Sequence, residues 1–127
     1  MVRSIMTFLY ASLAGSGCHR IPERSFFYRG TQFPVCARCT GVFLGHHSFA
    51  AGYISSVLLG YELKFGAGSL SVAALLMVPM AADWVLQEYG DIESTNFRRL
   101  VTGALCGVSL AYISISILML IVRFIAS

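Results

Sequence analysis

Three long stretches without a charged residue constrain this sequence of 127 residues most strongly, at 39–61, 65–82 and 100–122. As an α-helix, a stretch the length of 100–122 reaches about 34 Å, and the hydrocarbon core of a bilayer is about 30 Å thick. Only 12% of the residues are charged, whereas soluble domains carry roughly 25%. We therefore expect an integral membrane protein in the lipid bilayer. The length and composition exclude a secreted disulfide miniprotein, a disordered tail, a coiled coil and a nucleic-acid-binding domain.

The expected architecture is an all-α membrane protein with three to four transmembrane helices in a single membrane domain, 1–127. The N-terminal apolar segment is short for a full span, so a short tilted, re-entrant or interfacial helix is expected there. The expected segments are a short N-terminal apolar helix (1–17), a cysteine and histidine loop (18–39) and transmembrane helices at 40–60, 66–87 and 99–123.

The basic residues of the short loops predict the orientation. Two arginine clusters lie on one side of the membrane: Arg20, Arg24, Arg29 and Arg38 before the 40–60 helix, and Arg98 and Arg99 before the last helix. Lys64 and Arg123 are expected on the other side, and the side of Arg3 depends on whether the N-terminal segment spans the membrane. Because short cytoplasmic loops are enriched in Lys and Arg, the cysteine loop is predicted to be cytosolic.

Cysteine and histidine residues cluster in the loop, where the candidate metal ligands are Cys18, His19, Cys36 and Cys39. The Cys-x-x-Cys spacing suits two thiolates on one tetrahedral ion, and reducing cytosol favours a metal, most simply zinc, over a disulfide. Adjacent residues rarely bind one ion together, so Cys18 is a better third ligand than His19. The fourth ligand is His19, an acidic residue or water. A redox pair at a helix N-terminus and unreactive thiols are the alternative interpretations.

Polar residues at the ends of the last two predicted helices indicate a pocket on the same membrane face. Asp83 lies in an apolar run, and Gln87 is one turn later on the same helix face. Ionisable groups at membrane depth normally face protein or water and have a partner. Arg98 and Arg99 oppose the dipole of the helix that they begin. They therefore require a partner such as Asp83, Glu93, an anionic lipid headgroup or a substrate phosphate.

Two Gly-x-x-x-Gly patterns, 41–45 and 103–107, begin just inside this face. Small residues at this spacing allow close helix packing in membranes. The patterns predict that the cysteine-bearing helix and the arginine-bearing helix pack together.

The assembled motifs resemble a family of small predicted membrane proteins of bacteria and archaea that is defined only as a domain of unknown function. The motifs are Cys18-His19, Arg24-Ser25, the block 36–41, Pro79 with Asp83 and Gln87, and the block 96–103 that begins at Asn96. The resemblance extends from Cys18 to Gly107. It implies a membrane protein and no established activity. Trp84 stands where the family pattern has Gly.

The favoured hypothesis is a zinc-binding membrane protein in which Cys18, Cys36 and Cys39 hold the ion, with His19 as a candidate fourth ligand. Beside them we expect a polar pocket of Arg24, Asp83, Gln87, Asn96 and Arg99. An open zinc position would make it a membrane metalloenzyme. A membrane thiol-disulfide oxidoreductase that passes electrons to a quinone is the second hypothesis. The third is an accessory subunit of a larger membrane complex with a structural zinc knuckle. So few spans bury little surface, so a homo-oligomer or partner membrane subunits are expected.

Overall fold

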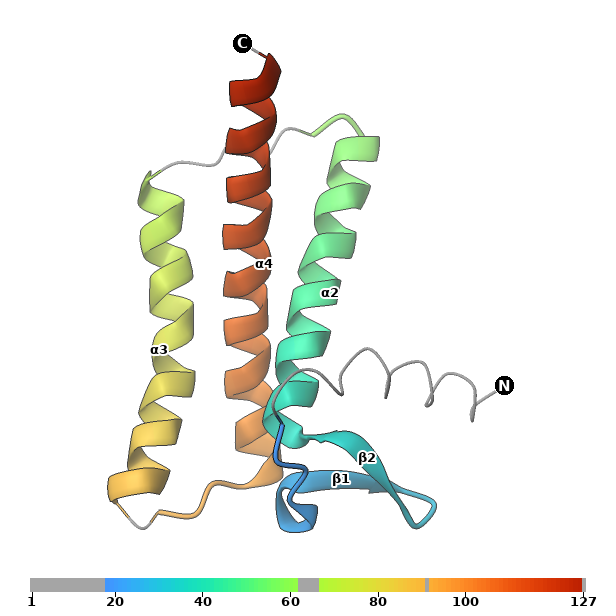
Figure 1. The fold of residues 1–127 in the computed structure, drawn as a ribbon, viewed down its shortest axis with the longest axis vertical. Coiled ribbons are helices and arrows are strands. Elements are labelled where there is room, and N and C mark those ends of the chain that lie inside the picture. Colours follow the sequence, from blue (N-terminus) through green and yellow to red (C-terminus); the bar gives the residue numbers. More distant parts are fainter. Residues whose placement is uncertain (1–17, 62–66, 91, 127) are drawn as a thin grey trace.

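Three long helices form most of the computed structural model, which describes residues 18–61, 67–90 and 92–126. They are α2 (Ala37–Leu58), α3 (Ala67–Tyr89) and α4 (Asn96–Ala126), which lie side by side as Figure 1 shows. The N-terminal segment 1–17, predicted as a short apolar helix, lies outside the described residues. At 1.5 Å per residue, the 31 residues of α4 span about 46 Å, which exceeds the thickness of a bilayer core.

Two of these helices are long and apolar enough to cross a membrane, over Gly68–Tyr89 and Asn96–Ala126. Among the described helices, α2 is not such a candidate, although its length of 22 residues is comparable. Its sequence contains Ser, Gly and a His pair between the apolar residues. The chain is therefore mostly helical, with two membrane-span candidates in its described part.

The loop expected at 18–39 contains regular structure, so the expectation of an all-α fold was wrong at this place. A single 3-10 turn, η1 (Pro22–Arg24), leads into the antiparallel strands β1 (Ser25–Tyr28) and β2 (Thr31–Cys36). Tyr28 pairs with Thr31 across a two-residue turn in which both Arg29 and Gly30 have positive φ, 49° and 77°. Positive φ at both central residues is characteristic of a type I′ turn, whose twist matches that of the two paired strands. Aromatic and β-branched residues on both sides of it favour the strands.

Glycines set the distance between α2 and α4. A Cβ atom on Gly45 would lie 2.1 Å from the carbonyl oxygen of Ala104, and one on Gly107 would lie 2.1 Å from that of Val42. Gly41 and Gly103 make equally close approaches to the opposite backbone. The two Gly-x-x-x-Gly patterns therefore face each other, and no larger residue fits at these positions without moving a helix.

The helix α3 packs against the other side of α4. The buried hydroxyl of Ser109 on α4 donates a hydrogen bond of 2.7 Å to the carbonyl oxygen of Ala73 on α3. Both residues are fully or nearly fully buried, as is Cys106. The described contact between α3 and α4 thus contains small residues, which are typical of helix packing in membrane proteins, while large apolar residues such as Leu75 and Leu118 are exposed on the outside.

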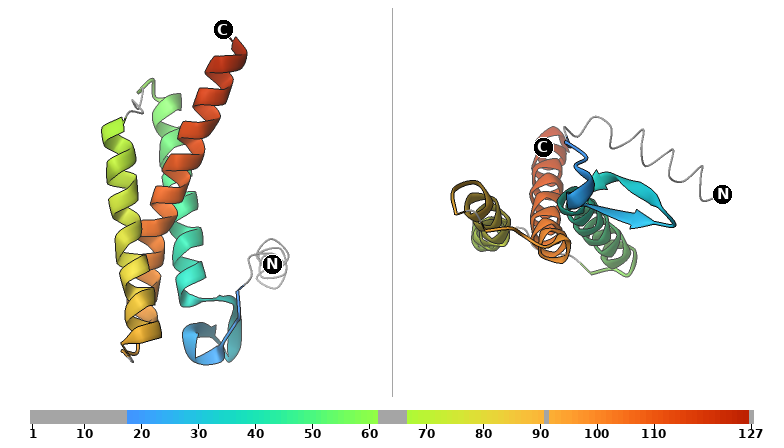
Figure 2. Two further views of the ribbon diagram at one scale, coloured as in Figure 1. Left: turned by 60° about the vertical axis from the view of Figure 1, so that its left-hand side comes forward. Right: turned by 90° about the horizontal axis from the view of Figure 1, so that it is seen from below.

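All the polar elements meet at one end of the bundle. The start of α2, the end of α3 and the start of α4 lie together in Figure 1, and the hairpin lies against the start of α2. Figure 2 shows the same arrangement from two further directions, with the C-terminus of α4 at the far end. This arrangement brings segments that are far apart in the sequence to a single site.

Candidate metal centre and the polar cluster beside it

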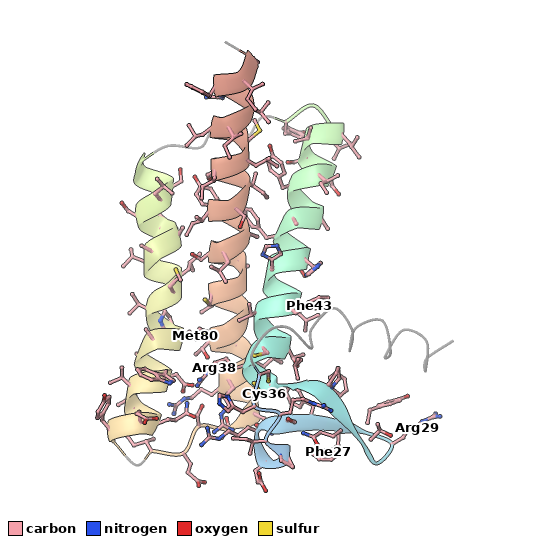
Figure 3. All side chains as sticks on the ribbon, in the orientation of Figure 1. Phe27, Arg29, Cys36, Arg38, Phe43 and Met80 are labelled. Carbon is pink, nitrogen blue, oxygen red and sulfur yellow. The ribbon has the colours of Figure 1, made fainter. Side chains whose placement is uncertain are left out.

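Three cysteines lie together where the hairpin joins α2. Cys36 ends β2 and is also the N-cap residue of α2, and Cys39 lies in the first turn of that helix. The hairpin returns the chain to its starting point, so that Cys18 lies beside Cys36, whose backbone N–H donates to the Cys18 sulfur over 3.2 Å. The three Sγ atoms all lie within 4.8 Å of one another. Figure 3 labels Cys36 and Arg38 at this junction.

The sulfur triangle fits a tetrahedral metal ion. With Zn–S bonds of about 2.3 Å, two thiolates on one zinc ion are about 3.8 Å apart, so small side-chain rotations would close the triangle around the ion. His19 is exposed and is not part of the sulfur cluster. It lines a cavity to which the three cysteines also contribute. Among the described residues, the structure therefore offers three ligands for one ion.

The cysteine environment favours a thiolate at Cys36. The neighbouring thiol of Cys39 lowers the pKa of Cys36 to about 5 from its ordinary value of 9.0, and it outweighs the desolvation that raises the pKa. Backbone N–H groups of Arg38 and Cys39 at the start of α2 act in the same direction as the thiol. The same pairing with Cys36 raises the pKa of Cys39, so Cys36 is the thiolate of the pair, and a metal ion would displace the proton of Cys39.

The fourth cysteine lies apart from this cluster. Cys106 is 2% exposed in the middle of α4, where it packs among small residues.

Asp83 is the centre of the polar cluster beside the cysteines. Its side chain is 2% exposed and pairs with two arginines, Arg38 from α2 at 2.5 Å and Arg98 from α4 at 2.7 Å. The Gln87 amide also donates to Asp83 over 2.8 Å. One carboxylate thus connects all three helices.

A second part of the cluster connects α4 to α3 and to the hairpin. Arg99, 8% exposed, donates to the side-chain oxygens of Gln87 and Asn96, each over 3.1 Å. The Asn96 amide in turn donates to the carbonyl oxygen of Ser25 over 3.3 Å. The hairpin that carries the cysteine segment is therefore fixed to the arginine-bearing end of α4.

A cavity of about 410 Å³ joins the cysteine triad to this polar cluster. Cysteine and arginine residues both line this cavity. Its lining residues are Cys18, His19, Arg20, Ile21, Arg24, Cys36, Arg38, Cys39, Trp84, Gln87, Glu88 and Arg99.

Of the predicted pocket residues, the structure brings Asp83, Gln87, Asn96 and Arg99 into one hydrogen-bonded network. Arg24 lines the cavity without a bond to that network. The sequence named Asp83 as a candidate partner of Arg98, and the structure pairs the two, but Arg38 was missed as the second partner of Asp83. The position of Arg38 within Cys-x-Arg-Cys, in the first turn of a helix that begins at the same face, was the available signal. Trp84 also contributes to the cavity wall.

Comparison with known proteins places these residues in a family. A family described as "Predicted membrane protein (DUF2085)" matches residues 18–113, which include the cysteine triad and the polar cluster. An uncharacterized protein of Methanothermobacter thermautotrophicus is 39% identical over 97 residues, 76% of this chain and 83% of the relative. An uncharacterized protein of Methanocaldococcus jannaschii is 33% identical over 95 residues, 75% of this chain and 59% of that longer relative. No solved structure matches. The chain therefore belongs to the DUF2085 family of predicted membrane proteins.

Proposed function

We propose that this chain is an integral membrane metalloprotein that binds one zinc ion through Cys18, Cys36 and Cys39. The observation that carries the proposal is the mutual proximity of the three Sγ atoms, all within 4.8 Å. Two of these residues lie on a rigid helix start, and the third is held by a hydrogen bond from the backbone of Cys36. Thiolates at this spacing are typical zinc ligands.

Three protein ligands would leave one zinc position for water, for His19 or for another ligand. Zinc with an open position lowers the pKa of bound water and polarises a bound carbonyl or phosphoryl oxygen, as in hydrolytic metalloenzymes. The cavity supports this interpretation, because it gives the metal centre space for a substrate next to arginine side chains.

We further propose that α2, α3 and α4 all cross the bilayer with the cysteine site at the cytosolic boundary. The arginines of the hairpin and of the α4 start support this orientation through the positive-inside rule.

Exposed apolar side chains along α3, among them Leu70, Leu75 and Val78, would contact lipid, a second copy of the chain or a partner subunit. The mass of the protein in nanodiscs, measured by light scattering, distinguishes monomer from oligomer.

Metal analysis tests the proposal. Protein purified in detergent under reducing conditions should contain one zinc ion per chain, and Cys36→Ser and Cys39→Ser should each lose it. Cys106→Ser is the matched control, because it removes a thiol of the same type that is outside the triad. Zinc retained in all three variants, or absent from the unmodified protein, contradicts the proposal.

A second function, membrane thiol-disulfide exchange, is favoured by one specific observation, the low pKa of Cys36 beside the Cys39 thiol. Oxidation of Cys36 and Cys39 to a disulfide would release two electrons and two protons, which a quinone would accept to become a quinol. Metal-free protein in which this disulfide forms and turns over with quinone would support exchange in place of zinc binding.

A further inference from the structure

The cavity beside the cysteine triad has an excess of positive charge. Four arginine residues line it, Arg20, Arg24, Arg38 and Arg99, and the buried carboxylate of Asp83 lies beside them, paired with Arg38. Both oxygens of Asp83 are already occupied by Arg38, Arg98 and the Gln87 amide. One carboxylate carries a single negative charge, so it cannot neutralise all of these arginines.

Arg99 carries the clearest unbalanced charge. Only 8% of the residue is exposed, yet its two hydrogen bonds go to the neutral amide oxygens of Gln87 and Asn96. In the described part of the chain, no carboxylate oxygen lies within 4.0 Å of its guanidinium nitrogens. Removing a charge from water without an opposite charge is costly, so a burial of this kind indicates a missing anion.

Two further cavity residues have unused capacity to donate hydrogen bonds. The Nε atom of Arg38 is buried and has no hydrogen-bond partner among the described residues. Arg24 is exposed at the cavity edge, and within the described ranges its guanidinium forms no ion pair. Arg24 and Arg99 approach each other closely enough for their charges to repel. An anion between them would attract both guanidinium groups and so offset their mutual repulsion.

The other acids that line the two cavities, within the described residues, do not remove the excess. Glu23 and Glu93 are exposed and line a second cavity, of about 360 Å³, that Arg24 and Arg99 also border. Neither glutamate is within ion-pair distance of a described arginine. Glu88 lines the first cavity but is also exposed, so water screens its charge.

We propose that the 410 Å³ cavity binds a phosphate-bearing anion between Arg24 and Arg99, next to the cysteine triad. Arginine forks match phosphate oxygens, and a phosphate would satisfy several unused donors at once. The volume is that of a small-molecule site, so an organic group attached to the phosphate also fits. The phosphate could belong to a lipid headgroup or to a soluble monoester. The inference goes beyond zinc binding, because the arginines would hold the anion with or without the metal.

The test uses the full chain in nanodiscs of phosphatidylcholine. Two probes are soluble, inorganic phosphate and glycerol 3-phosphate, and are titrated by calorimetry. Two are lipids, phosphatidic acid and phosphatidylglycerol, and are measured by native mass spectrometry after mixing into the discs. Binding of at least one probe is expected. Binding confined to the lipid probes identifies a headgroup as the source, and binding confined to the soluble probes identifies a free phosphate ester.

Two cavity variants and one matched control give the decisive comparison. Arg99→Gln and Arg24→Gln should each weaken binding about tenfold or more, since each removes a charge-assisted contact. Arg29→Gln at the exposed hairpin tip makes the same charge change and should leave binding unchanged. Arg24 is exposed and outside the network, so Arg24→Gln provides the test even if Arg99→Gln fails to fold.

The anion and metal proposals fail separately. Zinc is measured in every sample. Zinc-loaded protein that binds none of the four probes, or that binds them equally well in Arg24→Gln and Arg29→Gln, overturns the anion site and leaves the metal proposal intact. Probe binding that depends on Arg24 in protein without zinc supports the anion site and contradicts only the metal proposal.

Discussion

The ion pairs of Asp83 lead to a quantitative prediction for the variant Asp83→Asn. The side chain is 2% exposed, and the variant would leave both Arg38 and Arg98 without a carboxylate. Breaking a buried ion pair by removing one partner costs about 3–5 kcal/mol. Arg98 has a side chain that is 44% exposed and can rehydrate, so its pair contributes at most about 1 kcal/mol. Arg38, 20% exposed, becomes an uncompensated buried charge, and we expect a total loss of about 3 kcal/mol.

Thermal unfolding in detergent, followed by circular dichroism, measures this loss. For a chain of this size, about 3 kcal/mol corresponds to a fall in Tm of about 10 °C. Glu88→Gln, which removes an exposed carboxylate from the same helix, should change Tm by less than about 2 °C. The double variant Asp83→Asn with Arg38→Met should recover part of the loss, because the unpaired charge is removed too. A Tm for Asp83→Asn equal to that of the control, or no recovery in the double variant, would refute the reasoning.

Two further predictions concern helix packing and thiol ionisation. Gly45→Ala should destabilise the protein by about 1–3 kcal/mol, since the added Cβ would lie 2.1 Å from a carbonyl oxygen of α4. Gly52→Ala is the control in the same Tm assay. Its added Cβ has no other atom within 4 Å, so this variant should be neutral or stabilising. In metal-free protein, iodoacetamide should modify Cys36 at pH 6, because its pKa of about 5 leaves a thiolate there; labelling that begins only above pH 8 would be the contrary result. Because this pKa is below that of the unfolded thiol, Cys36 stabilises the folded metal-free protein above about pH 9, and the contribution is lost as the pH falls toward 5.

Much of the architecture could be predicted from the distribution of charges. The uncharged stretches coincide with long helices. A helix that crosses a bilayer needs a long apolar middle, and its charged residues lie at the ends, so gaps between charged residues indicate the helices. The hairpin could not be predicted as easily. Its strands are only four and six residues long, and the Arg29-Gly30 turn is a weaker signal than Asn-Gly or Asp-Gly.

The candidate site was partly predictable for a similar reason. Cys36 and Cys39 are near neighbours in the chain, so their spacing in sequence nearly determines their spacing in space. The pairing of Asp83 with Arg38, 45 positions away, depends on the Gly contacts that set the distance between α2 and α4. No local pattern encodes which of several arginines reaches the carboxylate, because that choice depends on the packing of three helices at once.

The most direct test of the central claim is the X-ray absorption spectrum of the purified protein at the zinc edge. A site built from Cys18, Cys36 and Cys39 predicts three sulfur neighbours at about 2.3 Å and one nitrogen or oxygen neighbour at about 2.0 Å. In Cys39→Ser, any residual zinc should have fewer sulfur neighbours. A first shell of nitrogen and oxygen alone, or a protein purified under reducing conditions without zinc, would contradict a cysteine metal centre.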